Sequence, residues 1–210
     1  MLKTGNFTVY KKMGLVLPVL AALLVFTVIL AVALGAVYVP LGRSFRIILD
    51  NIGLIDDPTL PGDQVSIICM VRLPRVIVAC VAGAALSVCG AVMQGLFRNP
   101  MADPGVLGVS SGAGLGAIIS ITTGLAARSI YTMPMFAAVG ALGAVAVIYL
   151  LSLRRGRIAP LTLILSGIAV STFIGAVTQF ILIKSNTYEV RRYVFWTMGG
   201  LSGMMWEQVR

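Results

Sequence analysis

Five long stretches of this chain carry no charged side chain, and each is long enough to cross a lipid bilayer. A helix needs about 20 consecutive apolar residues to span the hydrocarbon core. Because every backbone N–H and C=O must be paired within hydrocarbon, such stretches fold as helices. We therefore predict an all-α, polytopic transmembrane helical bundle of about five spans, with 1–210 forming a single transmembrane domain. The predicted spans lie at about 15–37, 74–97, 105–124, 134–153 and 160–183.

The composition agrees with a protein embedded in lipid. Charged residues make up 11% of the chain and hydrophobic residues 59%, whereas a soluble domain carries about 25% charge. The net charge of +9 is typical of loop arginines and lysines at a bilayer surface, and no basic stretch has the interleaved aromatics of a nucleic-acid-binding surface. We expect the lipid bilayer, and no nucleic acid, as a partner. With no histidine and no C-x-x-C spacing among the three cysteines, we predict neither a metal site nor a cofactor.

The first uncharged run, 13–42, follows a short basic leader. The competing interpretation is a cleaved signal peptide, whose apolar core is only about 7–15 residues long. Because this run is much longer, we favour a retained first span. The polar segment after it contains a predicted short amphipathic helix around 44–52. Near the end of the chain, the run 193–206 is too short to span, and its glycines predict a broken segment at the membrane interface.

Five spans place the two ends of the chain on opposite sides of the membrane. Cytoplasmic loops carry an excess of arginine and lysine, and short clusters close to span ends count most. The densest such cluster is Arg154-Arg155-Gly156-Arg157, so we predict that it lies inside. This orientation also places the N-terminus in the cytoplasm. The raw charge count slightly favours the opposite orientation, so the arginines on the outer side need an explanation of their own.

Small residues recur every four positions in two of the predicted spans. Such faces let helix backbones approach closely, and we expect them to form helix-packing interfaces. The alternative interpretation is that they line a moving pore. The residues are Gly108, Gly112 and Gly116 in the third span and Gly167, Ser171 and Gly175 in the fifth.

A polar turn, Arg98–Gly105, separates the second and third spans. Its prolines prevent a continuous helix, and non-helical backbone at membrane depth survives only against protein or a water-filled cavity. One interpretation is a simple tight turn at the cytoplasmic surface. The other is that Asn99 and Met101 project toward a pathway and form its cytoplasmic gate. Asp103 is placed to cap the third span.

Arg72 and Arg75 flank a proline near the start of the second span. With the N-terminus inside, both lie on the outer surface. Arginine forms bidentate pairs with carboxylates, so two arginines at a span entrance suit an acidic docking partner. The alternative is anchoring at the membrane interface, where arginine side chains extend toward the headgroups.

The fifth span carries hydroxyl and amide side chains among its apolar residues. Hydroxyls in a span often bond to their own backbone or to a neighbouring helix. The alternative is that they form the wall of a water-filled pathway, lined by Thr162 and Ser166. The full set is Thr162, Ser166, Ser171, Thr172, Thr178 and Gln179.

The sequence lacks two features, and their absence narrows the range of functions we expect. The chain has no G-x-x-x-x-G-K-[ST] phosphate loop. No acidic or basic residue lies inside the five uncharged runs, whereas ion-coupled carriers and proton relays usually keep such residues there. We therefore expect neither ATP hydrolysis nor proton-driven transport by this chain, so the energy for active transport would come from a partner.

The stretch from Arg72 to Gly116 resembles the FecCD-type permease subunits of bacterial ABC importers for iron-siderophores, haem and cobalamin. The resemblance is carried by the turn RNPMADPGVLGVSSGAGLGA, and it continues through LTLILSGIAVS and FWTMGGLSGMMWEQV. It covers most of the chain from Arg72 onward, while the first 70 residues match only in layout.

In that family two permease subunits of about ten spans each pair around a central pathway. Two cytoplasmic ATP-binding subunits power transport, and an extracytoplasmic substrate-binding protein delivers the substrate. The resemblance thus implies a second permease subunit, in a homo- or heterodimer, and a location in the bacterial inner membrane. The chain stops where a sixth span would begin, so we expect the N-terminal part of such a permease, without the loop that docks the ATP-binding subunit.

The resemblance also implies roles for single residues. The family's R-x-P-R-like arginines receive acidic residues of the binding protein, which gives Arg72 and Arg75 a docking role. Its Asn-Pro-x-Ala turn lies near the cytoplasmic gate, which gives that role to Asn99 and Met101. Its fifth span lines the pathway, with Thr162 near the inner end. The rival hypotheses are a stand-alone channel or secondary carrier, and a non-transporting scaffold subunit.

Overall fold

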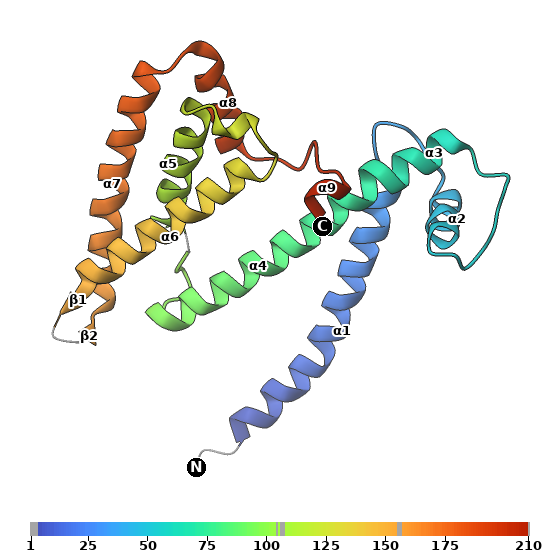
Figure 1. Cartoon of the computed structure of the whole chain (residues 1–210). Helices are drawn as coiled ribbons and strands as arrows, with labels where there is room; N and C mark the ends of the chain where they lie inside the picture. Colours follow the sequence, from blue (N-terminus) through green and yellow to red (C-terminus); the bar gives the residue numbers. More distant parts are fainter. Residues whose placement is uncertain (1–3, 104, 106–107, 155–156, 210) are drawn as a thin grey trace. The chain divides into compact units, whose positions relative to one another are not determined.

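The structure of the chain, a computed structural model, describes residues 4–103, 105, 108–154 and 157–209 (Figure 1). Nearly all regular structure in these residues is helical, which confirms the predicted all-α fold class. The exception is a pair of two-residue antiparallel strands, β1 (Leu153–Arg154) and β2 (Arg157–Ile158).

The chain divides into two compact units. One comprises Met1–Gly83 with Leu201–Arg210, and the other comprises Ala84–Gly200. The organisation of 1–210 as a single transmembrane domain therefore stays a prediction.

The described residues of the first unit form two long helices and two short ones. The first long helix is α1 (Thr4–Ala33), and the second runs without interruption from Gly62 to Phe97, so its last part belongs to the other unit. That second helix comprises α3 (Gly62–Ser66), the π-helical η1 (Ile67–Arg72) and α4 (Leu73–Phe97). The short helices of the unit are α2 (Leu41–Asn51) and, near the end of the chain, α9 (Trp206–Val209).

The core of this unit lies where α1, α2 and η1 meet. Val32 of α1, Ile47 of α2 and Ile68 of η1 are buried there, together with Val39 and Cys69. α2 covers most of the helix predicted around 44–52 and begins earlier, after Pro40. Its buried side packs on the ends of both long helices, which places α2 beside the end of the first span.

Hydrogen bonds to aspartate carboxylates fix the conformation of the loop after α2. The carboxylate of Asp57 accepts hydrogen bonds from the hydroxyl of Thr59 at 2.5 Å and from its backbone N–H at 3.1 Å. These bonds, the hydroxyl bond first, lower the pKa of Asp57 below its ordinary value. The N–H of Asp57 in turn donates to the Asp50 carboxylate at 3.1 Å. The Asp-Asp-Pro stretch thus forms a hydrogen-bonded turn, as aspartates in turns commonly do.

The second unit is organised around α5 (Val109–Thr122), which packs on α6, α7 and α8. Much of α5 is buried, including Gly112, Gly116, Ile118 and Ser120. The surrounding elements are the 3-10 helix η3 (Leu125–Ala127), α6 (Thr132–Ser152), α7 (Pro160–Lys184) and α8 (Thr187–Met198).

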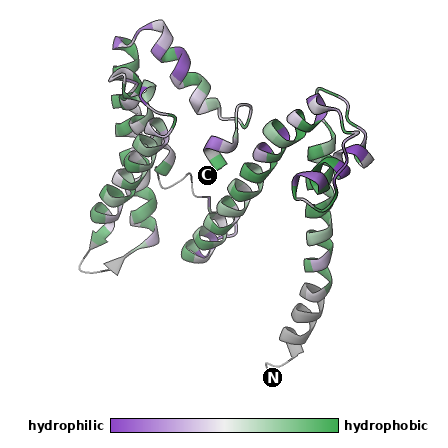
Figure 2. Ribbon diagram, turned by 45° about the vertical axis from the view of Figure 1, so that its right-hand side comes forward, coloured by the Kyte–Doolittle hydropathy of each residue, from purple (hydrophilic) through white to green (hydrophobic). Residues whose placement is uncertain are grey.

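Four helical segments among the described residues are long and apolar enough to cross a membrane. Figure 2 shows the long helices coloured mainly as hydrophobic, with hydrophilic residues gathered in the short helices and loops. These segments overlap four of the five predicted spans. They are Gly14–Ala33, Gly62–Phe97, Thr132–Ser152 and Pro160–Lys184.

The third predicted span, 105–124, differs from the structure. Its helix, α5, has only 14 residues, which rise about 21 Å and so fall short of a hydrocarbon core of about 30 Å. The helix begins after Gly108, whose φ of +69° lies in the left-handed region and stops the helix there. Because α5 is short and largely buried, it is an inner helix of this unit.

The segment predicted as broken, 193–206, is helical in its first part. α8 starts with a capping box in which the Asn186 side chain accepts from the Glu189 N–H, and the Glu189 carboxylate accepts from the Asn186 N–H. The helix continues to Met198. The break follows at Gly199 and Gly200, which have φ values of 70° and 149° that favour glycine.

The contact between α5 and α6 depends on glycines that meet backbone atoms. A Cβ added at Gly112 would contact the carbonyl oxygen of Gly140, and one added at Gly116 would contact the carbonyl oxygen of Phe136. Gly140 of α6 would in turn contact the carbonyl oxygen of Gly112. Backbone atoms of a packed helix cannot move aside as a flexible side chain can, so these positions accept only glycine at this separation.

We expect Gly116→Ala to lower the thermal stability of the purified protein in detergent, because overpacking costs about 1–3 kcal/mol. Gly143→Ala is the matched control, since nothing lies within 4 Å of a Cβ at Gly143 in the same helix pair. Alanine also has the higher helix propensity, so the control should be neutral or slightly stabilising. Equal losses of melting temperature in the two variants would contradict the close approach of α5 and α6.

Candidate functional site

Arg72 is buried at the junction of the two long helices of the first unit. It is the last residue of η1, and its side chain is only 7% exposed. Its guanidinium donates to the carbonyl oxygens of Val32 at 2.7 Å and Ala33 at 2.6 Å, and also to that of Val37. Val32 and Ala33 end α1, so Arg72 pairs carbonyls that no further helical turn reaches. Within this chain the Arg72 guanidinium is thus occupied by backbone carbonyls, and its docking role stays a prediction.

Arg75, in contrast, is exposed on the first turn of α4. Its Nε–H donates to the carbonyl oxygen of Leu201 at 3.0 Å, which holds the stem of the side chain in place. The end of the guanidinium beyond this bond has the fork of donors that pairs with a carboxylate in bidentate fashion. Of the two predicted docking residues, Arg75 is the exposed one in this chain, and the docking role of both stays a prediction.

Pro74, between the two arginines, changes the hydrogen bonding of the helix around it. In the π-helical segment the N–H of Leu73 donates to Ile68, five residues earlier. The next donor in this register would be residue 74, and proline has no N–H. The carbonyl of Cys69 therefore lacks its helical donor. The indole N–H of Trp206 takes that place and donates to the Cys69 oxygen at 2.8 Å.

The turn after α4 places Asn99 and Met101 at the surface of the second unit. Arg98 has a φ of +49°, which ends the helix at Phe97. The side-chain oxygen of Asn99 accepts from the N–H of Met101 at 2.9 Å, so this side chain orders its own turn. Met101 is 85% exposed. The proposed gate residues are thus adjacent and accessible in this turn, and their role in a gate stays a prediction.

Asp103 bonds within the same turn and does not cap α5. Its carboxylate accepts from the N–H of Gly105 at 2.6 Å. The N-cap of α5 is Gly108, which has no side-chain cap. The expectation that Asp103 caps the third span is therefore wrong, because the helix begins several residues later than the sequence suggests.

The structure brings together three of the six small residues predicted to pack. A Cβ at Gly108 would lie 2.6 Å from the Ser171 hydroxyl and 3.5 Å from the Gly167 carbonyl oxygen. Ser171 donates that hydroxyl to the Gly167 oxygen at 2.6 Å. Gly112 and Gly116 face α6 instead, and nothing lies within 4 Å of a Cβ at Gly175. The two small-residue stripes therefore meet only at the start of α5.

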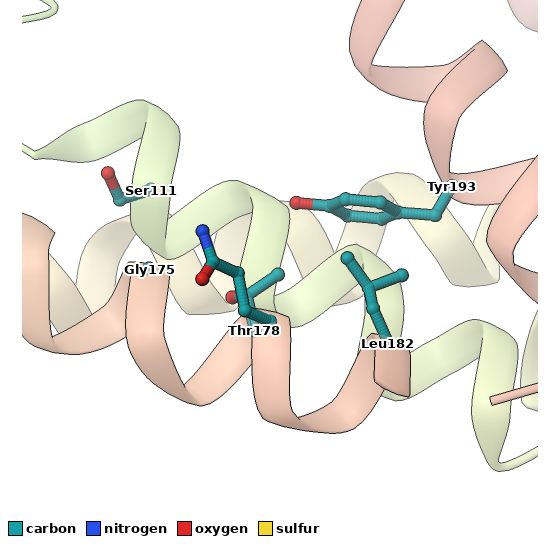
Figure 3. A pocket seen from close by; sticks show the side chains of 6 residues that line it. Ser111, Gly175, Thr178, Leu182 and Tyr193 are labelled. Atoms are coloured by element: carbon teal, nitrogen blue, oxygen red, sulfur yellow. The ribbon is translucent and has the colours of Figure 1, made fainter. Parts of the chain in front are cut away.

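A cavity of about 310 Å³ lies between α5, α7 and α8 (Figure 3). Tyr193 reaches across from α8 and points its hydroxyl toward α5 in this view, with Leu182 of α7 beside its ring. A Cβ at Gly114 would lie 2.9 Å from the Tyr193 oxygen, so the glycine makes room for the phenol. Burial raises the pKa of Tyr193, which keeps the hydroxyl neutral and able to donate. The lining residues are Ser111, Gly175, Thr178, Gln179, Leu182 and Tyr193.

The predicted pathway residues Thr162 and Ser166 lie elsewhere. Both are half-buried in the first turns of α7 and do not line this cavity. The polar side chains that α7 contributes to it, Thr178 and Gln179, come from the other end of the helix. Sequence reasoning did not single out Ser111, which lies in a glycine- and serine-rich run, or the tyrosine, which lies outside the predicted spans.

Known proteins resemble this chain in sequence and in fold. The profile of the FecCD transport family matches residues 23–210. The cobalamin import system permease protein BtuC of Halobacterium salinarum is 44% identical over 139 residues, which are 66% of this chain and 37% of that protein. The vitamin B12 import system permease protein BtuC of Salmonella paratyphi A is 36% identical over 153 residues, which are 70% of this chain and 46% of that protein.

A solved structure, described as an inward-facing conformation of a metal-chelate type ABC transporter, has the same fold. It is 30% identical, superposes with a TM-score of 0.73, and the match covers 91% of this chain and 55% of the other. The chain spans less than half the length of the two BtuC proteins that it matches.

The apolar helices and these relatives define a multi-pass, helical membrane protein. The family match extends over nearly the whole described chain, well beyond the stretch that first suggested it. The chain belongs to the FecCD transport family, which confirms the resemblance drawn from its sequence.

We expect Trp206→Phe to destabilise the protein by about 1 kcal/mol, because the Cys69 carbonyl loses its donor. In a Pro74→Ala background the new N–H of residue 74 can serve that carbonyl, so the same Trp206→Phe change should cost much less. A double-mutant cycle of melting temperatures in detergent measures this coupling. Additive effects of the two changes would show that Trp206 does not replace a donor lost to proline.

Proposed function

We propose that this chain forms part of a transmembrane permease subunit of a binding-protein-dependent ABC importer for iron-siderophore, haem or cobalamin-type chelates. The observation that carries the proposal is the family match over residues 23–210, combined with the four long apolar helices that lie within it. The BtuC relatives are named as cobalamin and vitamin B12 import permeases, and the structural relative is described as a metal-chelate transporter.

The energy for import would come from cytoplasmic ATP-binding subunits, because this chain has no phosphate loop. A second permease subunit, in a homo- or heterodimer, would complete the pathway, and an extracytoplasmic substrate-binding protein would deliver the chelate. The chain itself would not be an enzyme. Its contribution is a set of helices that can form one wall of a passage.

For the pathway we propose the helices of the second unit. Thr162 and Ser166 at the start of α7 are candidate lining residues, and Asn99 and Met101 form the candidate cytoplasmic gate. The cavity beside Tyr193 supports a polar passage, since Ser111, Thr178 and Gln179 add hydrogen-bonding groups to an otherwise apolar wall. Pathways for polar substrates need such groups at membrane depth.

For docking we propose that Arg75 receives a carboxylate of the binding protein. It is exposed, positively charged and held by its bond to Leu201, so little side-chain entropy would be lost on binding. A charge at an interface rim acts mainly on the association rate and on the salt dependence of binding. The docking surface would therefore weaken with increasing ionic strength.

The test uses the full-length gene product with its ATP-binding subunit in liposomes. We expect the substrate-loaded binding protein to stimulate ATP hydrolysis and to bind with an affinity that Arg75→Glu lowers about tenfold or more. Arg98→Glu is the matched control for docking, because it makes the same charge change in another exposed residue, directly after α4.

Two results would overturn parts of this proposal. Equal affinity of the Arg75→Glu variant would remove the docking role of that residue. Substrate that crosses down its gradient without any ATP-binding subunit would show a stand-alone channel or a secondary carrier.

We further propose a bacterial inner-membrane location with the N-terminus in the cytoplasm. Tyr38 follows the first span and is 81% exposed, and Met101 follows the second and is 85% exposed. In a variant without native cysteines, an impermeant maleimide applied outside intact spheroplasts should label Tyr38→Cys and spare Met101→Cys. The reverse pattern would invert the proposed orientation, and labelling of both would contradict a crossing between them.

A further inference from the structure

A row of apolar side chains lies exposed along α2. Leu41 and Phe45 belong to the helix and Ile52 directly follows its last residue, and their spacing of four and seven residues keeps them on one side. They are 54%, 58% and 60% exposed. Ser44 and Ile47 are buried on a different side, so the row lies outside the core of the first unit. A continuous row of this kind marks a surface that meets another molecule or a membrane.

The polar side of α2 is paired within the chain. The Arg43 guanidinium donates to the side-chain oxygen of Gln64 at 3.1 Å, and that of Arg46 lies 3.7 Å from the Asp57 carboxylate. The carboxylate of Asp50 accepts from the N–H of Asp57 at 3.1 Å. These contacts turn the polar side toward the following loop and α3. The apolar row therefore points away from the part of the chain that α2 holds.

The position of α2 along the first span fixes its depth. The apolar segment Gly14–Ala33 has 20 residues, which rise about 30 Å, as much as the hydrocarbon core is thick. A segment of this length that crosses the bilayer has its last residue at headgroup level. Val32, one residue earlier, packs in the same core as Ile47 of α2, and the helix lies beside the end of α1 (Figure 1). α2 is therefore at the boundary between the membrane and water.

The sequence of α2 fits that boundary. Helices that lie in the interface plane combine an apolar side with a strongly charged side and low overall hydrophobicity. The 11 residues of α2 include three charged ones, Arg43, Arg46 and Asp50. At headgroup depth, lipid is the medium around a membrane protein, and it covers an apolar row without any further partner. This favours a lipid surface over a second protein.

We propose that α2 is a membrane-interface helix, which inserts Leu41, Phe45 and Ile52 between the lipid headgroups and the upper part of the acyl chains. Because α2 packs against α1 and η1, this anchor also sets how deep the ends of these helices lie in the bilayer. The anchor is independent of the proposed import function, since it needs only the bilayer.

Spin labels in nanodiscs of phosphatidylethanolamine and phosphatidylglycerol test the anchor. The full-length gene product without native cysteines carries one label at a time, at Leu41→Cys, Phe45→Cys or Ile52→Cys. Arg43→Cys and Arg46→Cys are the matched controls on the polar side of the same helix. Collisions with oxygen, which concentrates in hydrocarbon, are compared with collisions with a water-soluble nickel chelate. We expect the ratio of oxygen to nickel collisions to be about tenfold higher on the apolar side.

Two other patterns would overturn the proposal. Frequent nickel collisions at all five positions would place the whole helix in water. Rare collisions with both reagents at Leu41, Phe45 and Ile52, together with slow motion of the labels, would show that protein covers the row. That protein would be another part of the full-length chain, a second copy or a partner.

A second measurement needs no label. Phe45→Ala and Ile47→Ala remove large apolar side chains from neighbouring sides of α2. In detergent, we expect Ile47→Ala to lower the melting temperature clearly, because it opens a cavity in the core, and Phe45→Ala to leave it nearly unchanged. Similar losses in the two variants would mean that Phe45 packs against protein and would contradict a lipid-facing row.

Discussion

A buried carbonyl that a helix break leaves without a donor must find another one, because an unpaired polar group buried away from water is costly. The described part of this protein meets that demand with side chains. Arg72 pairs the carbonyls at the end of α1, and Trp206 pairs the one that Pro74 leaves open. Arg192 likewise donates to the carbonyl oxygen of Ala126 in η3, at 3.0 Å. Polar side chains near these helix ends thus pair backbone carbonyls.

The second unit depends on a different constraint, which is the closeness of its helices. Glycines let the backbone of α5 reach that of α6, and this enclosure buries a helix too short to cross the membrane alone. The cavity beside Tyr193 lies on the flank of this glycine-rich helix.

Hydropathy predicted α1, α4, α6 and α7 well, because an uncharged run long enough to span has no stable alternative to a helix in lipid. It overestimated α5, since the left-handed conformation of Gly108 leaves no mark on hydropathy. The surroundings of Arg72 and Arg75 were harder to predict from the sequence. An R-x-P-R pattern shows two charges but not the π-helical register that buries one of them. The cavity residues come from three separate helices, so no single stretch of sequence could reveal them.

The π-helical segment also alters how the second helix should be compared with others. A π turn accommodates one more residue than an α turn, and each residue of an α-helix advances about 100° around the axis. The face that α3 presents to α2 is therefore offset by about that angle from the face that continues along α4. A helical wheel drawn through Gly62–Phe97 as one regular helix assigns buried and exposed sides wrongly on one side of Ile67–Arg72. Relatives with one residue fewer in this segment would have a regular helix here, with the two faces back in phase.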